Sequence, residues 1–147
     1  MSDNKKTIRR YYEEVFNQGR LEVLDEIVVA DHIEHNPLPG QTQGIEGIKQ
    51  RVAMLRAAFN PQFTLEDVLA DGDKVVVRWS NKGTHLADFF GVPATGRPVV
   101  VSGIDIHQLR EGKLAEHWAI RDDLTTMLQL GVIQPPGPPD GGGRGEL

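Results

Sequence analysis

Four ionisable side chains lie on two predicted strands within Val99–Asp122, which are joined by a tight glycine-containing turn. Asp105 and His107 alternate with apolar residues on the first strand, and His117 and Arg121 occupy alternate positions on the second. Alternate side chains of a strand share one face. If both faces line one hollow, a pocket receives a carboxylate, two imidazoles and a guanidinium, which are the groups of general acid–base catalysis.

Asp105 and His107 are the predicted centre of this chemistry. Residues two apart on a strand have Cα atoms about 6.5–7 Å apart, so the tips of the two side chains can meet. A carboxylate beside an imidazole favours its charged form and fixes its tautomer, and the pair could deprotonate a phenol. The alternative is a purely structural Asp–His hydrogen bond. Function is favoured because polar groups are costly to bury on a strand rich in Val and Ile.

The other two ionisable candidates each have a structural alternative. His117 is predicted to act as a second acid or base or as a substrate hydrogen-bond donor, and otherwise to lie at a rim or a dimer contact. Arg121 is predicted to hold an oxygen atom of a ligand by charge-assisted hydrogen bonds. It could equally pair with Asp105, Asp122 or Asp123.

Three further residues are predicted to bind substrate. Asn36 could orient a carbonyl group, or could cap a loop ahead of Pro37. Trp79 could form the floor of a pocket for aromatic ligands, or belong to the core. Phe90, with its neighbour Phe89, is expected to form a pocket wall or a lid.

No metal or organic cofactor is expected. His32 and His35 are three residues apart, but they lie in a predicted loop, for which a short strand at His32–His35 is the alternative. They have no convincing third ligand except the distant His85. A glycine-rich phosphate loop and a dinucleotide-binding motif are both missing from the sequence.

Composition excludes several classes of function. The chain has 147 residues, a net charge of −5 and no cysteine. An acidic balance argues against binding nucleic acid or an anionic membrane, and the lack of cysteine excludes disulfides and thiolate chemistry. The N-terminal residues lack the apolar segment of a signal peptide, so a cytoplasmic protein is expected.

The periodicity of apolar residues predicts how these side chains are positioned. Helical spacing gives way after Pro61 to alternation with a period of two, which predicts an α+β domain. A curved, cone-shaped antiparallel sheet is expected to wrap around three N-terminal helices. A single domain is predicted over residues 1–133, followed by a disordered tail rich in Pro and Gly at 134–147. The expected helices are Lys5–Gln18, Leu21–Val28 and Ile45–Phe59, and the first strands are Phe63–Leu69 and Lys74–His85.

Several short motifs, in this order and spacing, resemble a known family. They are Phe16–Arg20, His35–Pro37, Gly83–His85, Phe90–Arg97, Gly112–Trp118 and Leu128–Gly131. Together they resemble the SnoaL-like polyketide cyclases, which have the nuclear-transport-factor-2-like cone fold. The resemblance covers Thr7 to Ile133.

The resemblance implies ring closure of an aromatic polyketide by an aldol reaction without metal or cofactor. In that family a pocket Asp removes the substrate proton, helped by a His, a Gln and an Asn. Counting from the shared motifs, the Asp falls on Ala119, the His on Asp105, the Gln on Gly103 and the Asn on Asn36. The base position therefore holds a methyl group, which cannot accept a proton.

The altered residues resemble a subgroup of the family that assists hydroxylation of an anthracycline-type ring. The leading expectation is therefore a cofactor-independent hydroxylase of a polycyclic quinone or phenol, using Asp105, His107 and Arg121. Oxygen would attack the ionised ring, and a reductase partner could supply electrons. The alternatives are a polyketide ester cyclase with a shifted catalytic Asp and a non-catalytic module that binds a hydrophobic ligand. A homodimer is expected, because the open sheet face is rich in Val and Trp.

Overall fold

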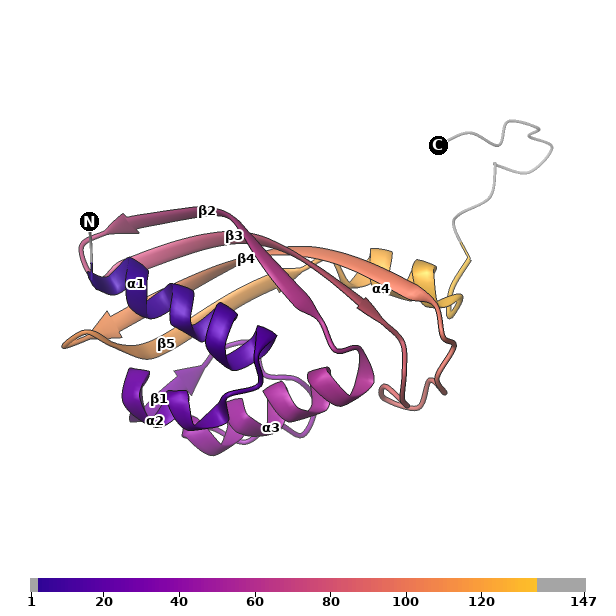
Figure 1. Ribbon diagram of the computed structural model, residues 1–147, viewed down its shortest axis with the longest axis horizontal. Helices are drawn as coiled ribbons and strands as arrows, with labels where there is room; N and C mark the ends of the chain where they lie inside the picture. The colour runs from indigo at the N-terminus through magenta and orange to yellow at the C-terminus, as the bar shows by residue number, and fades with distance from the viewer. Residues whose placement is uncertain (1–2, 135–147) are drawn as a thin grey trace.

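Residues 3–134 are described in the computed structural model of the chain. A five-stranded sheet with the order β1-β5-β4-β3-β2 curves over three helices (Figure 1). The strands are β1 (Val28–Glu34), β2 (Gln62–Asp71), β3 (Lys74–Thr84), β4 (Pro98–Arg110) and β5 (Lys113–Arg121). This arrangement confirms the predicted α+β class. The predicted tail lies outside the described residues from position 135 onward.

The helices pack on the concave face of the sheet, and their apolar side chains form the core with the inward residues of the strands (Figure 1). α4 lies apart from the other helices, beside β4. No described helix is long and apolar enough to cross a bilayer. The helices are α1 (Asp3–Arg10), α2 (Leu24–Ile27), α3 (Gly44–Ala58) and α4 (Asp123–Leu130), with a short 3-10 turn at Leu21–Val23.

The first helix differs from the expected regular one. It begins at Asp3 and continues as a π-helical segment over Tyr11–Asn17, which carries two consecutive buried tyrosines, Tyr11 and Tyr12. Single π-helical turns inside α-helices are frequent at functional sites. This segment places Tyr12 under the sheet, against β4.

The largest difference from the sequence prediction is β1. Residues 30–44 have a loop-like composition, yet Val28–Glu34 forms an edge strand that pairs with β5 in parallel. Its register sets Glu34 beside His117. His32 and Glu34, which alternation assigns to one face, are both buried. Polar residues on the inner face concealed this strand from a search for apolar alternation.

Candidate active site

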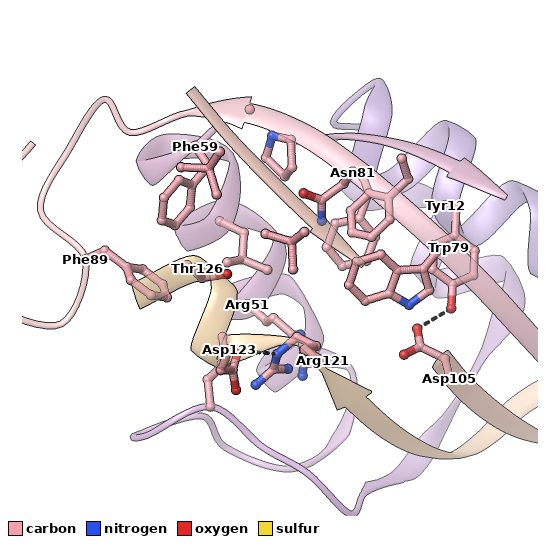
Figure 2. A pocket seen from close by; sticks show the side chains of 18 of the residues that line it. Tyr12, Arg51, Phe59, Trp79, Asn81, Phe89, Asp105, Arg121, Asp123 and Thr126 are labelled. Atoms are coloured by element: carbon pink, nitrogen blue, oxygen red, sulfur yellow. Dashed lines mark hydrogen bonds and ion pairs between the residues drawn. The ribbon is translucent and has the colours of Figure 1, made fainter. Parts of the chain in front are cut away.

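The cavity between sheet and helices contains two chemically different regions (Figure 2). Its inner end is formed by Tyr12, Asp105 and His117, and its outer end by Phe59, Phe89 and Met127. The space between these walls, including the opening, is about 880 Å³. The remaining lining is mostly apolar, so the inner end provides the polar groups that can orient a ligand.

Tyr12 joins the two residues that the sequence predicted as the catalytic pair. Its hydroxyl donates a hydrogen bond to Asp105 Oδ2, and its oxygen lies 2.8 Å from His107 Nε2. The sequence predicted direct contact between the tips of Asp105 and His107, but the phenol of Tyr12 bridges them. Burial and the neighbouring Asp105 charge hold the pKa of Tyr12 well above its usual value, so its hydroxyl remains a donor.

His117 lies between two carboxylates. Its Nδ1–H donates to Glu34 Oε1 at 2.6 Å, and its Nε2 is 3.3 Å from Asp105 Oδ2. Burial disfavours the imidazolium, but the hydrogen bonds and charges of Asp105 and Glu34 outweigh it and raise the pKa of His117. Arg51 Nη1 is 3.6 Å from Glu34 Oε1. Two carboxylates and two cations therefore form a buried network of balanced charge.

Asp105 is the ionised group that faces the cavity. Burial raises the pKa of its carboxyl, but His117, His107 and the Tyr12 hydrogen bond outweigh burial and leave that pKa well below its usual range. His107 is different: burial and the charge of His117 lower its pKa far below 6.5, so its ring is neutral. The site thus offers a carboxylate base beside an imidazolium acid, backed by a neutral histidine.

Register explains how a carboxylate at Asp105 can act near the expected base position. Asp105 and Ala119 are direct partners across the antiparallel β4–β5 pair. Residues paired in this way have Cα atoms about 4.5–5.5 Å apart. A carboxylate on Asp105 therefore projects from the strand next to the position where the family resemblance expects one.

The remaining predicted residues are divided between the cavity and other roles. Trp79 and Arg121 line the cavity, and Arg121 Nε is 3.4 Å from Asp123 Oδ1. The Oδ1 atom of Asn36 accepts a hydrogen bond from the Ala119 N–H at 2.8 Å, so it fixes the backbone of β5. Phe90 is 47% exposed and does not belong to the cavity lining, whereas Phe89 does.

Sequence reasoning missed Tyr12, Glu34 and Arg51. Tyr12 belongs to an apolar helical stripe, and its partner Asp105 is 93 residues away in the chain. Glu34 lies two residues after His32, so both side chains are on one face of the strand. This spacing was the available signal for a polar inner face. Arg51 interrupts the apolar stripe of α3, and its side chain is buried.

The ligand types at the inner end also allow a metal to be considered. Asp105, His107 and His117 offer one ligand atom each within 4.8 Å of one another. Two histidines and one carboxylate are a known set for transition metals. Here the Tyr12 hydroxyl lies between Asp105 and His107. The two ring nitrogens of His117 face the carboxylates of Glu34 and Asp105. Hydrogen bonds therefore account for the arrangement of these three side chains.

Comparison with characterised proteins identifies two similar enzymes. The chain is 31% identical to aklanonic acid methyl ester cyclase DauD of Streptomyces sp. (strain C5), covering 92% of this chain and 86% of DauD. It is also 31% identical to aklanonic acid methyl ester cyclase DnrD of Streptomyces peucetius, covering 92% of this chain and 95% of DnrD. Among solved structures, TsrD from Streptomyces laurentii superposes with a TM-score of 0.82 at 28% identity, covering 89% of this chain and 96% of TsrD.

These relatives correct the leading expectation from the sequence. Both curated relatives are cyclases, so the hydroxylase interpretation is wrong and the cyclase alternative is favoured. The hydroxylase interpretation rested on the absence of a carboxylate at Ala119. The structure places the carboxylate of Asp105 on the directly paired residue.

The fold, the cavity and the relatives agree with a family match that covers nearly all of the described chain. Residues 6–130 fit the sequence profile described as SnoaL-like polyketide cyclase. The chain therefore belongs to the SnoaL-like polyketide cyclase family.

Proposed function

We propose that this protein closes a ring in the methyl ester of an anthracycline-type polyketide by an intramolecular aldol reaction. The observation that carries the proposal is the buried, ionised Asp105, which faces a largely apolar cavity in a member of a cyclase family. Two relatives are aklanonic acid methyl ester cyclases, so this ester is the first substrate to test.

The arrangement supplies both halves of an aldol reaction. Asp105 takes a proton from a carbon next to carbonyl groups, and the electron pair of the broken C–H bond moves to the carbonyl oxygen as an enolate. The enolate carbon then bonds to a second carbonyl carbon of the same molecule. The imidazolium of His117, which lines the cavity, protonates the resulting alkoxide. Rotation of the protonated Asp105 carboxyl group about Cβ–Cγ then brings its proton to His117, whose Nε2 lies 3.3 Å from Oδ2, and its return restores the starting state.

The low pKa of Asp105 has a cost for this step, because a weaker base has less driving force for proton removal. A carbon acid flanked by two carbonyl groups reduces that demand, since its enolate is spread over both. Ring closure of this type involves no net oxidation. Molecular oxygen and a reductase partner therefore have no part in the proposal.

The decisive experiment is ring closure of aklanonic acid methyl ester with and without oxygen. We expect product at equal rates in air and under anaerobic conditions. Asp105→Ala should lower kcat by about 10²- to 10⁴-fold, the usual contribution of general base catalysis. A requirement for oxygen, or an Asp105→Ala variant with unchanged kcat, would refute the proposal.

A double variant tests whether the carboxylate can occupy either paired position. Asp105→Ala/Ala119→Asp restores a carboxylate at the residue directly opposite. We expect it to recover at least part of the activity lost in Asp105→Ala. Ala119→Asp alone places two carboxylates side by side, which raises the pKa of one and should move the acidic limb of the rate profile to higher pH.

We also propose that the protein is a homodimer joined through the outer face of the sheet. Several large apolar side chains on that face are exposed, including Ile120 at 74%. Exposed apolar clusters of this kind mark interaction surfaces. Ile120 is on β5, and the exposed apolar residues on the adjacent β4 are Val100, Ile104 and Ile106. Sedimentation at micromolar concentration should give the mass of two chains, and Ile120→Asp should give the mass of one.

A further inference from the structure

The indole nitrogen of Trp79 is a buried hydrogen-bond donor without an acceptor among residues 3–134. Trp79 lies on β3, is 3% exposed and lines the cavity. A buried tryptophan N–H usually has a partner, because leaving it unpaired costs free energy. An oxygen atom of a ligand in the cavity would supply the missing acceptor.

Gly103 allows the indole to lie where it does. Trp79 and Gly103 are direct partners across the β3–β4 pair. A Cβ atom added to Gly103 would lie 2.4 Å from Cζ2 and 2.9 Å from Cε2 of Trp79, closer than real side chains approach. Because Cε2 is bonded to the indole nitrogen, the missing side chain makes room for the N–H edge of the ring. The ring of Phe63 packs edge-on against the indole, with ring centroids 5.1 Å apart.

A second unused group belongs to Asp105, which lies two residues beyond Gly103 on β4 and is therefore the diagonal neighbour of Trp79. Asp105 Oδ2 receives the Tyr12 hydroxyl and lies 3.3 Å from His117, but Oδ1 has no hydrogen-bond partner in the described chain. Figure 2 shows the indole nitrogen on the side of the ring that faces the Tyr12–Asp105 hydrogen bond. At the inner end of the cavity, one donor and one carboxylate oxygen therefore lack a hydrogen-bond partner within residues 3–134.

We propose that the Trp79 N–H binds the substrate carbonyl oxygen whose neighbouring carbon is deprotonated, and that Gly103 is the positioning residue for this contact. The inference rests on the proposed cyclase function. As Oδ1 of Asp105 takes the proton from carbon, the electron pair moves to the carbonyl oxygen. The Trp79 N–H then donates to a negatively charged enolate oxygen, and this bond is stronger than the one to the neutral carbonyl.

Binding of two matched probes tests the contact without turnover. The probes are 2-(hydroxymethyl)anthraquinone and 2-(hydroxymethyl)anthracene. The first has two ring carbonyl groups that the second lacks. The chain has two tryptophans, so Trp118→Phe leaves Trp79 as the source of the single indole N–H signal in an NMR spectrum. Trp118 stacks on His35 away from the cavity lining, which makes this background suitable.

We expect the quinone to bind about 5- to 10-fold more tightly than the anthracene, the usual worth of one neutral hydrogen bond. It should also move the indole N–H signal to lower field. Replacing the remaining tryptophan by 3-benzothienylalanine, which has sulfur in place of N–H, should abolish the preference while retaining anthracene binding. Equal binding of both probes, no binding of either, or an unmoved indole signal would overturn the inference.

Turnover gives an independent readout. Trp79→Phe should raise KM about 5- to 10-fold, because the neutral carbonyl loses its hydrogen bond. It should also lower kcat about 10- to 100-fold, because the contact strengthens as the enolate forms. Gly103→Ala should act in the same direction, because its Cβ atom would displace the indole. That atom would also lie 2.8 Å from the Ile120 carbonyl oxygen, so anthracene binding serves as the control for an intact β4–β5 pair. A Trp79→Phe variant with the parent kcat would contradict the assignment. If the parent protein fails to close the ring while the quinone preference is observed, the proposed function fails and the Trp79 contact stands.

Discussion

The two ends of the cavity differ in the polarity of the side chains that line them. The inner end holds ionised groups at fixed distances, with His117 between Glu34 and Asp105. The outer end is mostly aromatic and aliphatic, including Phe59 and Phe89, with Thr126 and the Arg121–Asp123 ion pair beside them. Apolar contacts bind a ligand without direction, whereas fixed charges act on particular atoms. In the proposed reaction, the outer end holds the substrate and the inner end carries out the proton transfers.

The largest expected effect comes from removing a charge behind the inner end. Glu34→Gln keeps the size of the side chain but leaves Arg51 without its carboxylate and His117 with one carboxylate instead of two. Breaking a buried ion pair typically costs about 3–5 kcal/mol, and we expect a loss in this range in the free energy of unfolding in urea at pH 7.

Glu46→Gln is the matched control, because the exposed Glu46 forms a 3.6 Å ion pair with Lys49 on the surface of α3. Surface pairs contribute little, so this variant should unfold like the parent. Equal losses in the two variants would mean that the inner network contributes no more than a surface pair.

A smaller effect should depend on pH and concerns His32. Burial and the charge of His117 lower the pKa of His32 to about 4. The unfolded chain takes up this proton below about pH 6.5, but the folded chain does not until about pH 4, so folding is penalised as pH falls between these values. At pH 5 the penalty is about 2 kcal/mol.

His32→Leu removes this titrating group. We expect the variant to gain about 2 kcal/mol relative to the parent on going from pH 7 to pH 5, measured by urea denaturation at both values. A difference that stays constant with pH would show that His32 titrates alike in the folded and unfolded chain.

The smallest expected effect concerns the outer end and distinguishes binding from chemistry. Phe89→Ala removes part of the apolar wall and should raise KM about 10-fold while leaving kcat nearly unchanged, as expected for a contact made equally before and during reaction. Phe90→Ala is the control, since Phe90 is exposed and outside the cavity lining. Steady-state kinetics on the same ester would measure both. A fall in kcat for Phe89→Ala would remove the proposed division between the two ends.

Much of the fold was predictable because its signals are local. Alternation along β3, β4 and β5 correctly placed Asp105 and His117 on inward faces, and the apolar stripe of α3 located that helix within one residue of its ends. For β1 the sequence offered only a short strand at His32–His35 as an alternative to a loop, because the inner face of Val28–Glu34 carries His32 and Glu34 and its pattern is not apolar. Its stability as a strand depends on pairing with β5, far along the chain.

The sequence by itself determined the class of fold, the inward carboxylate and the family resemblance, because each follows from residue type and short-range spacing. The tertiary structure decided which groups meet. It set Tyr12 between Asp105 and His107, and it set Asp105 opposite Ala119. Such contacts depend on strand register and on how a helix crosses the sheet. Both are fixed by packing between distant segments, which no local pattern records.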